Sequence, residues 1–199
     1  MKREELDEIW NYYLSLEKDM DLTSSYVEPR GQEEVLSFAF AKIIILACTE
    51  IESVFKVFCR ELGEENGNIG EYKRAILREY PTLVDAEISI PRLHKTIKPF
   101  RNWDNNRLSW WDAYQHVKHD RGNDYSEASY INAVSSLGAL YLLIFFLAYK
   151  TSLFFEDYKS TYIDSEYQSR YVFSNPNKRI SDFAEMGMAM NETIVIKTN

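Results

Sequence analysis

Apolar residues recur at every third or fourth position through most of the chain up to residue 158, which is the spacing of α-helices that bury one face. The pattern predicts a first amphipathic helix over residues 2–20, followed by a polar connector over residues 21–31. A second, strongly apolar helix is predicted over residues 32–62. A shorter third helix is predicted over residues 70–80, where Pro81 closes it.

The chain between residues 86 and 100 has a different pattern. Apolar and polar residues alternate there, and the segment contains Pro91 and Pro99, so we expect extended chain or a loop that crosses the body. A helix is then predicted over residues 109–120, with Ser109 as its N-cap and Gly122 just past its end.

The last long helix opens at a capping box. Asp124 and Glu127 have the Asp-x-x-Glu spacing in which each side chain satisfies a backbone amide of the first turn. Apolar residues then continue to about residue 157. Residues 1–158 are therefore predicted to form an all-α bundle of four or five helices.

The helical period is lost after residue 158. Residues 159–199 contain two short stretches typical of strands, at 170–173 and 193–197. We interpret this segment as an irregular, partly extended C-terminal tail that forms a short hairpin or docks on a partner.

Composition and charge limit the classes of function. Hydrophobic residues make up 45% of the chain and charged residues 27%, which is typical of a globular protein. The net charge of −8 argues against a general nucleic-acid coat protein or a polybasic membrane binder, because both need a positive field. A local basic site remains compatible with this charge.

The cysteines and the apolar runs indicate a compartment. Cys48 and Cys59 fall in one predicted helix, roughly 16 Å apart along its axis, which is too far for a disulfide. Both are interpreted as core residues in a reducing compartment, so a cytoplasmic location is expected. The charged N-terminus does not resemble a signal peptide. The apolar run over residues 137–149 is shorter than the roughly 20 residues of a membrane span, so we expect a buried helix and no membrane partner.

Residues 92–121 contain most of the candidate chemistry. Seven Lys or Arg residues lie there against three acids, together with all three histidines and three of the four tryptophans. Cations beside flat rings are what a phosphate-and-base ligand requires, so the segment predicts RNA or a nucleotide as partner. The residues assigned to binding are His116, Tyr114, Trp110, Trp111, Arg107 and Arg101.

Three interpretations compete for the helix in this segment, where Asp112, Gln115, His116 and His119 share one face. In the catalytic one, His119 transfers protons while Lys118 or Arg121 stabilises charge on a phosphate. In the metal one, an ion binds Asp112, His116 and His119, but the sequence has no further His/Cys cluster to complete the site, so no metal and no cofactor is expected. In the structural one, the face forms a buried polar network.

Two carboxylates supply partners for such a network. Glu50 and Glu52 interrupt apolar stripes of the second helix, and an unpaired buried charge costs several kcal/mol. Lys118, His119 or Arg121 are therefore predicted to pair with them. The same contact would also orient a catalytic histidine, so the exposure of His119 separates the interpretations.

Three features together are similar to a known family. They are the helix carrying Ala47-Cys-Thr-Glu-Ile-Glu-Ser-Val-Phe-Lys56, the short helix ending Tyr114-Gln-His-Val-Lys-His119, and the long apolar helix that follows. Over residues 33–156 the chain resembles the HEPN-type helical domains of bacteria. The resemblance implies an all-helical bundle, commonly a homodimer. Many members act as metal-independent RNases in toxin and defence systems, and others bind RNA or nucleotides without catalysis.

The catalytic signature of that family is an arginine followed by four to six residues and a histidine. The resemblance carries His119 over as the motif histidine and Gln115 as its polar companion. None of the upstream positions at that spacing is arginine, and Arg121 just after the histidine would take over its role. The sequence thus leaves two hypotheses, an RNA-binding or RNA-cleaving protein and a non-enzymatic helical interaction module.

Overall fold

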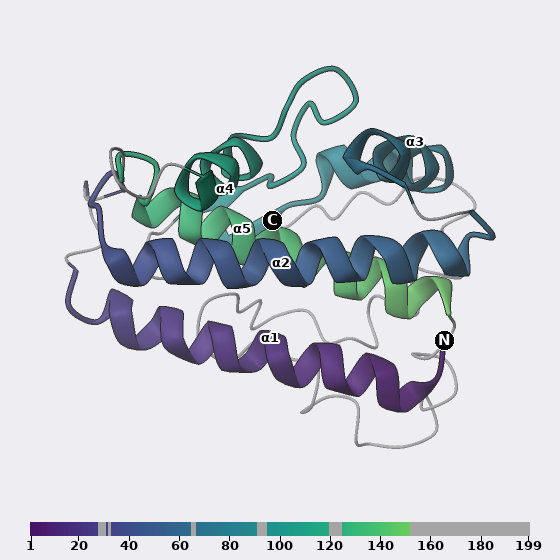
Figure 1. The fold of residues 1–199 in the computed structure, drawn as a ribbon, viewed down its shortest axis with the longest axis horizontal. Helices are drawn as coiled ribbons and strands as arrows, with labels where there is room; N and C mark the ends of the chain where they lie inside the picture. The colour runs from purple at the N-terminus through teal and green to yellow at the C-terminus, as the bar shows by residue number, and fades with distance from the viewer. Residues whose placement is uncertain (28–30, 32, 65–66, 91–94, 120–124, 152–199) are drawn as a thin grey trace.

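The structure is a computed structural model that describes residues 1–27, 31, 33–64, 67–90, 95–119 and 125–151. These residues contain five α-helices, which confirms the predicted all-α bundle (Figure 1). The predicted tail over residues 159–199 lies outside the described residues. The helices are α1 (Arg3–Ser24), α2 (Phe38–Glu61), α3 (Ile69–Glu79), α4 (Ser109–His119) and α5 (Tyr130–Lys150).

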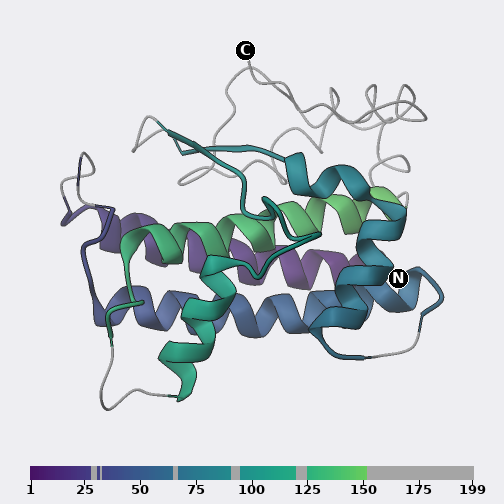
Figure 2. The ribbon, with the colours of Figure 1, turned by 90° about the horizontal axis from the view of Figure 1, so that it is seen from above.

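The three long helices form the body of the molecule. Helices α1, α2 and α5 contact one another along their lengths, while α3 and α4 pack on α2 from the side opposite α1 (Figures 1 and 2). The core between them is rich in Ile, Leu and aromatic rings, among them Phe40, Phe55 and Phe58 of α2. Helix α2 is therefore the central element and presents buried residues to every neighbour, as its nearly continuous apolar sequence requires.

Helix α1 is longer at its end than predicted. Residues 21–24, which were assigned to the connector, continue the helix, and the hydroxyl of Ser24 donates to the Met20 carbonyl at 2.6 Å. Ser24 and Met20 are both buried. The sequence pattern did not predict this last turn because its residues are mostly polar. Ser24 is buried there by packing against other parts of the chain, which the spacing of apolar residues does not indicate.

Helices α2 and α5 begin later than predicted, and for a shared reason. The Ser37 amide donates to the Ala128 carbonyl at 3.1 Å, and the Tyr130 amide donates to the Val35 carbonyl at 2.9 Å. This extended pairing keeps both segments out of helical geometry. Helix α2 instead starts at Phe38, where the Ser37 hydroxyl accepts from the Ala39 amide. Asp124 of the predicted capping box lies outside the described residues.

Helix α3 begins with a capping box at Asn68 and Glu71 and ends at Glu79. Pro81 follows the end of α3, as predicted, and is also the first residue of a 3-10 helix, η1 (Pro81–Asp85). The predicted extended chain follows as two antiparallel strands, β1 (Ile88–Ile90) and β2 (Lys95–Ile97), with Ile88 opposite Ile97. Ile88 and Ile90 are buried, so the hairpin packs on the helices through this strand.

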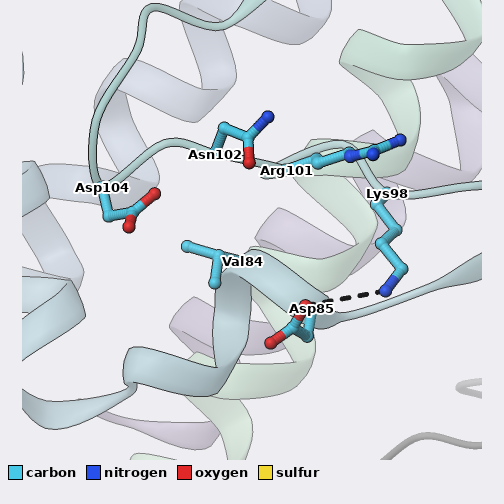
Figure 3. A pocket seen from close by; sticks show the side chains of 6 residues that line it. All are labelled: Val84, Asp85, Lys98, Arg101, Asn102 and Asp104. Atoms are coloured by element: carbon cyan, nitrogen blue, oxygen red, sulfur yellow. Dashed lines mark ion pairs between the residues drawn. The ribbon is translucent and has the colours of Figure 1, made fainter.

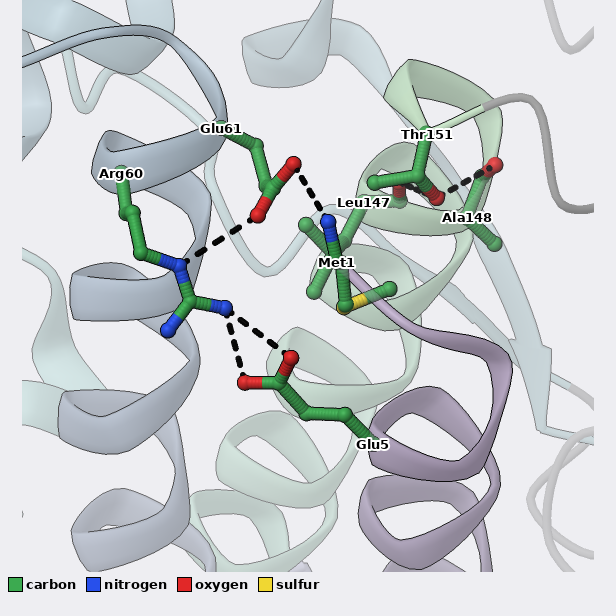
Figure 4. A network of polar contacts seen from close by, with 7 residues as sticks. All are labelled: Met1, Glu5, Arg60, Glu61, Leu147, Ala148 and Thr151. Atoms are coloured by element: carbon green, nitrogen blue, oxygen red, sulfur yellow. Dashed lines mark hydrogen bonds and ion pairs between the residues drawn. The ribbon is translucent and has the colours of Figure 1, made fainter.

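One end of the bundle is held together by a group of charges (Figure 4). Arg60 of α2 donates from one nitrogen to both carboxylate oxygens of Glu5 of α1, at 2.8 and 3.0 Å. The N-terminal ammonium lies 2.8 Å from Glu61. Burial alone would raise the pKa of Glu61, but the hydrogen bond and charge of that ammonium, assisted by Arg60, lower it.

Helix α5 is the one stretch among the described residues that is long and apolar enough to cross a membrane, over Tyr130–Ala148. Of this apolar stretch, 72% is buried inside the bundle, which is the environment of a core helix. The predicted extension of this helix to about residue 157 falls outside the described part of the chain.

Candidate functional site

Helix α4 lies across α2 and contacts α5 as well. It begins at Ser109, so Ser109 is its first residue and not the N-cap that the sequence suggested; the amides of Trp111 and Asp112 donate to the Leu108 carbonyl. Ala113 and Val117 lie on its buried face. The last turn of the helix projects beyond this buried face.

Three polar residues of that last turn are exposed: His116, Lys118 and His119. Gln115, directly before His116, is half-buried. Arg121, which was predicted to stand beside His119, lies outside the described residues. The structural interpretation requires His119 to be buried against Glu50 or Glu52. Its side chain is exposed instead, so it is not part of such a buried network.

A three-residue network ties α4 to α2. The hydroxyl of Tyr114 donates to Glu52 Oε1 at 3.1 Å and accepts from Lys118 Nζ at 2.9 Å. The ammonium also lies 4.0 Å from Glu52 and 4.9 Å above the centre of the Tyr114 ring. The hydrogen bond with Tyr114, with a smaller contribution from the charge of Glu52, raises the pKa of Lys118. The predicted contact between Glu52 and Lys118 is therefore present.

Glu50 does not take part in this network. Among the described residues it forms no ion pair with Lys118 or His119, and Arg121, the third predicted partner, lies outside the described residues. Two residues along a helix are about 200° apart around its axis, so Glu50 and Glu52 cannot both face α4. Glu50 lies instead on the side of α1, where burial and then the charge of Glu50 raise the pKa of Tyr12.

Two of the three rings that were assigned to base stacking are buried. Trp110 is 1% exposed and donates its indole N–H to the Pro99 carbonyl at 2.8 Å. Tyr114 is also 1% exposed. Neither presents a ring face to a ligand, because packing uses those faces. Trp111 is half-buried, with its ring 5.3 Å from that of Tyr114 and 6.3 Å from that of Phe55.

The two arginines that were assigned to binding lie away from the last turn of α4. Arg107 is exposed near the start of the helix and lies 3.7 Å from Asp112. Arg101 lies in the preceding loop and lines a separate hollow. Asp112, His116 and His119 do not come together as a metal site. Within the described part of the chain no group of three His, Cys, Asp or Glu side chains could hold an ion.

Two hollows lie near these residues. The first, of about 330 Å³, is apolar and lies beneath the last turn of α4, lined by Phe38, Ala41, Lys42, Ile45, Leu46, Val117 and Tyr125. The second, of about 430 Å³, is polar and lies between η1 and the loop before α4, lined by Val84, Asp85, Lys98, Arg101, Asn102 and Asp104 (Figure 3).

Sequence reasoning missed most of the second hollow. Only Arg101 was singled out, because the other lining residues sit in two polar turn segments with the composition of ordinary loops. The sequence signal that could have indicated this hollow was the segment Asn102-Trp-Asp-Asn-Asn106, in which polar residues surround a tryptophan. A loop that buries Phe100 and Trp103 while carrying so many polar side chains has a defined shape.

Comparison of the chain with family models, curated proteins and solved structures returns no match. The class that the fold defines is an all-α helical bundle, and its chemistry has to be inferred from the residues themselves.

Proposed function

We propose that this chain is a HEPN-like protein that binds RNA or a nucleotide with the exposed last turn of α4. The observation that supports the proposal is the fixed position of Lys118. Glu52 and Tyr114 orient its side chain, yet the side chain remains 42% exposed. An ammonium has three donors and Tyr114 uses one, so donors remain for a phosphate.

His116 and His119 stand on the same turn and extend the phosphate-binding group. The dipole of α4 places partial negative charge at this end of the helix, which works against an anion. Phosphate binding here therefore depends on the side chains and not on backbone amides. Half-buried Trp111 is the remaining candidate for stacking a base.

The catalytic form of the proposal is a metal-independent RNase of a bacterial defence or toxin system. His119 would transfer protons, with Gln115 as its polar companion, and Lys118 would stabilise negative charge on the phosphate. The exposure of His119 gives a substrate access to its imidazole. Cys48 and Cys59 are buried free thiols, which suits the reducing cytoplasm that we propose as the compartment.

One observation favours a second candidate, a non-enzymatic interaction module. Trp110 and Tyr114 are buried and serve packing, and the Glu52–Tyr114–Lys118 network joins two helices. In this case the network would contribute to stability alone. Replacing Lys118 would then lower the free energy of unfolding without any effect on RNA.

Binding to a fluorescent single-stranded RNA, measured by anisotropy at two salt concentrations with EDTA present, tests the proposal. We expect Lys118→Gln to weaken binding by roughly tenfold and to reduce the salt dependence by about one ion. The matched control is Lys18→Gln, since Lys18 is an exposed lysine of α1, on the side of α2 opposite α4, and its replacement should leave binding unchanged. Equal loss in both variants, or no binding by the wild type, would overturn the RNA proposal.

The same samples test catalysis. Cleavage of the RNA in EDTA by the wild type, lost in His119→Ala, is the result expected of a metal-independent RNase. Binding without cleavage in either protein would leave the binding function and remove the enzymatic one. Cleavage that EDTA abolishes would require a metal mechanism instead.

A further inference from the structure

The polar hollow between η1 and the loop before α4 has a defined arrangement of charges. Arg101 and Lys98 lie to one side of it and Asp104 to the other, with Val84 between them (Figure 3). Lys98 is held by two carboxylates, 3.6 Å from Asp85 and 3.2 Å from Glu87. Arg101 is exposed, and its guanidinium forms no hydrogen bond or ion pair with any other described residue.

The loop that builds this hollow is fixed from below. Phe100 and Trp103 are buried in the core, and the Pro99 carbonyl accepts the indole N–H of Trp110. Asn102 adopts φ 60°, a left-handed conformation that is uncommon outside glycine. Its carbonyl accepts from the amides of Asn105 and Asn106 at 3.1 and 2.8 Å. The polar side chains therefore stand on a rigid support before any ligand arrives.

The charges select a ligand with two unlike ends. The guanidinium of Arg101 offers only donors and suits a phosphate. The carboxylate of Asp104, which accepts a 2.6 Å hydrogen bond from Asn105, offers acceptors to hydroxyl or amino groups. Val84 provides an apolar surface between them. The lining carries two positive and two negative side chains, so a bare anion gains little from the site as a whole.

We propose that this hollow binds a nucleoside monophosphate, with the phosphate on Arg101, the ribose hydroxyls or the base on Asp104 and Asn102, and one face of the ligand on Val84. The volume of about 430 Å³ lies within the range of small-molecule sites and exceeds what inorganic phosphate or an amino acid would fill. The proposal does not rest on RNA binding at α4, because no residue is shared between the two sites.

Isothermal titration calorimetry of the full chain with AMP, GMP, CMP and UMP tests the site. We expect at least one of them to bind with a Kd below about 1 mM. Adenosine and inorganic phosphate should each bind at least tenfold more weakly than the preferred nucleotide. Arg101→Gln should weaken nucleotide binding by tenfold or more, which is the range of a lost charge-assisted hydrogen bond. Asp104→Asn should also weaken it.

Two control variants make the result specific. Arg74→Gln removes an exposed arginine of α3 outside the hollow and should leave the affinity unchanged. Lys18→Gln, at an exposed lysine of α1 that belongs to neither proposed site, should leave it unchanged too. Retained affinity in Arg101→Gln would overturn the proposal, as would the absence of binding by all four nucleotides. Inorganic phosphate binding as tightly as a nucleotide would mean an adventitious ion only.

Discussion

Glu50 and Glu52 sit two residues apart on α2 and meet different surroundings. Glu52 accepts a hydrogen bond from Tyr114 and lies 4.0 Å from Lys118, so its charge is compensated. Glu50 is half-buried toward α1, and burial raises its pKa. A half-buried carboxylate without a cation partner among the described residues is better tolerated in its protonated form, so Glu50 should lower stability where it is ionised.

We expect Glu50→Gln to raise the free energy of unfolding near pH 7, by no more than about 1 kcal/mol because the residue is only half-buried. Burial raises the pKa of Glu50 in the folded state above its value in the unfolded chain. The wild type is therefore not penalised below the unfolded pKa, and it loses stability as pH rises through the folded pKa, where Glu50 ionises. The gain from the substitution should therefore vanish near pH 4. Urea denaturation at both pH values measures it.

Glu52→Gln is the matched control for that substitution. It keeps an acceptor for the Tyr114 hydroxyl but loses the attraction to Lys118, so it should leave stability at pH 7 unchanged or lower it. If Glu50→Gln were destabilising at pH 7, the ionised Glu50 carboxylate would have a stabilising partner. The inference that burial destabilises its ionised form would then be wrong.

At the scale of elements, helix α4 and the loop before it form one unit. The Trp110 indole reaches back eleven residues to the Pro99 carbonyl, and its ring lies edge-on to Phe100 at 5.9 Å. The loop residues that line the polar hollow are thereby fixed to the helix that carries the candidate RNA site. A change at Trp110 should therefore affect both stability and nucleotide binding.

Trp110→Phe removes the indole N–H and leaves the buried Pro99 carbonyl without its donor. We expect a loss of about 1–3 kcal/mol in the free energy of unfolding, and weaker binding of whichever nucleoside monophosphate binds best, because the loop loses its anchor. Chemical denaturation and calorimetry measure the two effects. Trp111→Phe, at a half-buried ring without that bond, should cost less. Equal losses in the two variants would show that ring volume, and not the hydrogen bond, is responsible.

At the scale of the whole molecule, α5 is the helix that closes the core. It packs against both α1 and α2, and residues such as Leu140 and Leu143 are completely buried. Its hydropathy is sufficient for a membrane span, but the bundle supplies the apolar surroundings that the helix requires. The stability of the described bundle should therefore depend on single α5 side chains.

Leu140→Ala should lower the free energy of unfolding by about 2–5 kcal/mol, from lost burial and the cavity that remains. Leu22→Ala, on an α1 residue that is 60% exposed, should change it by less than about 0.5 kcal/mol. Urea denaturation of both variants checks the contrast. A loss below 1 kcal/mol at Leu140 would indicate that this face of α5 is not packed against the bundle.

The sequence alone determined the helices and their buried faces. Five of the predicted segments are helical in the structure, because the apolar period of each is set by the core that it must cover. The alternating segment with prolines likewise became the β1–β2 hairpin. Of the chemistry, the sequence predicted a cation near Glu52, since an acid inside an apolar stripe requires one, and left Lys118, His119 and Arg121 as candidates; in the structure Lys118 lies beside it.

Only the tertiary structure decided where α2 and α5 begin and which side each polar residue faces. Residues 35–37 pair with residues 128–130, far apart in the chain, and this pairing overrides the local helix signals. The burial of Trp110 and the choice of Glu52 over Glu50 as the carboxylate that faces α4 follow from packing angles that local spacing does not carry. The polar hollow arises the same way, because η1 and the loop before α4 lie side by side only in the folded chain.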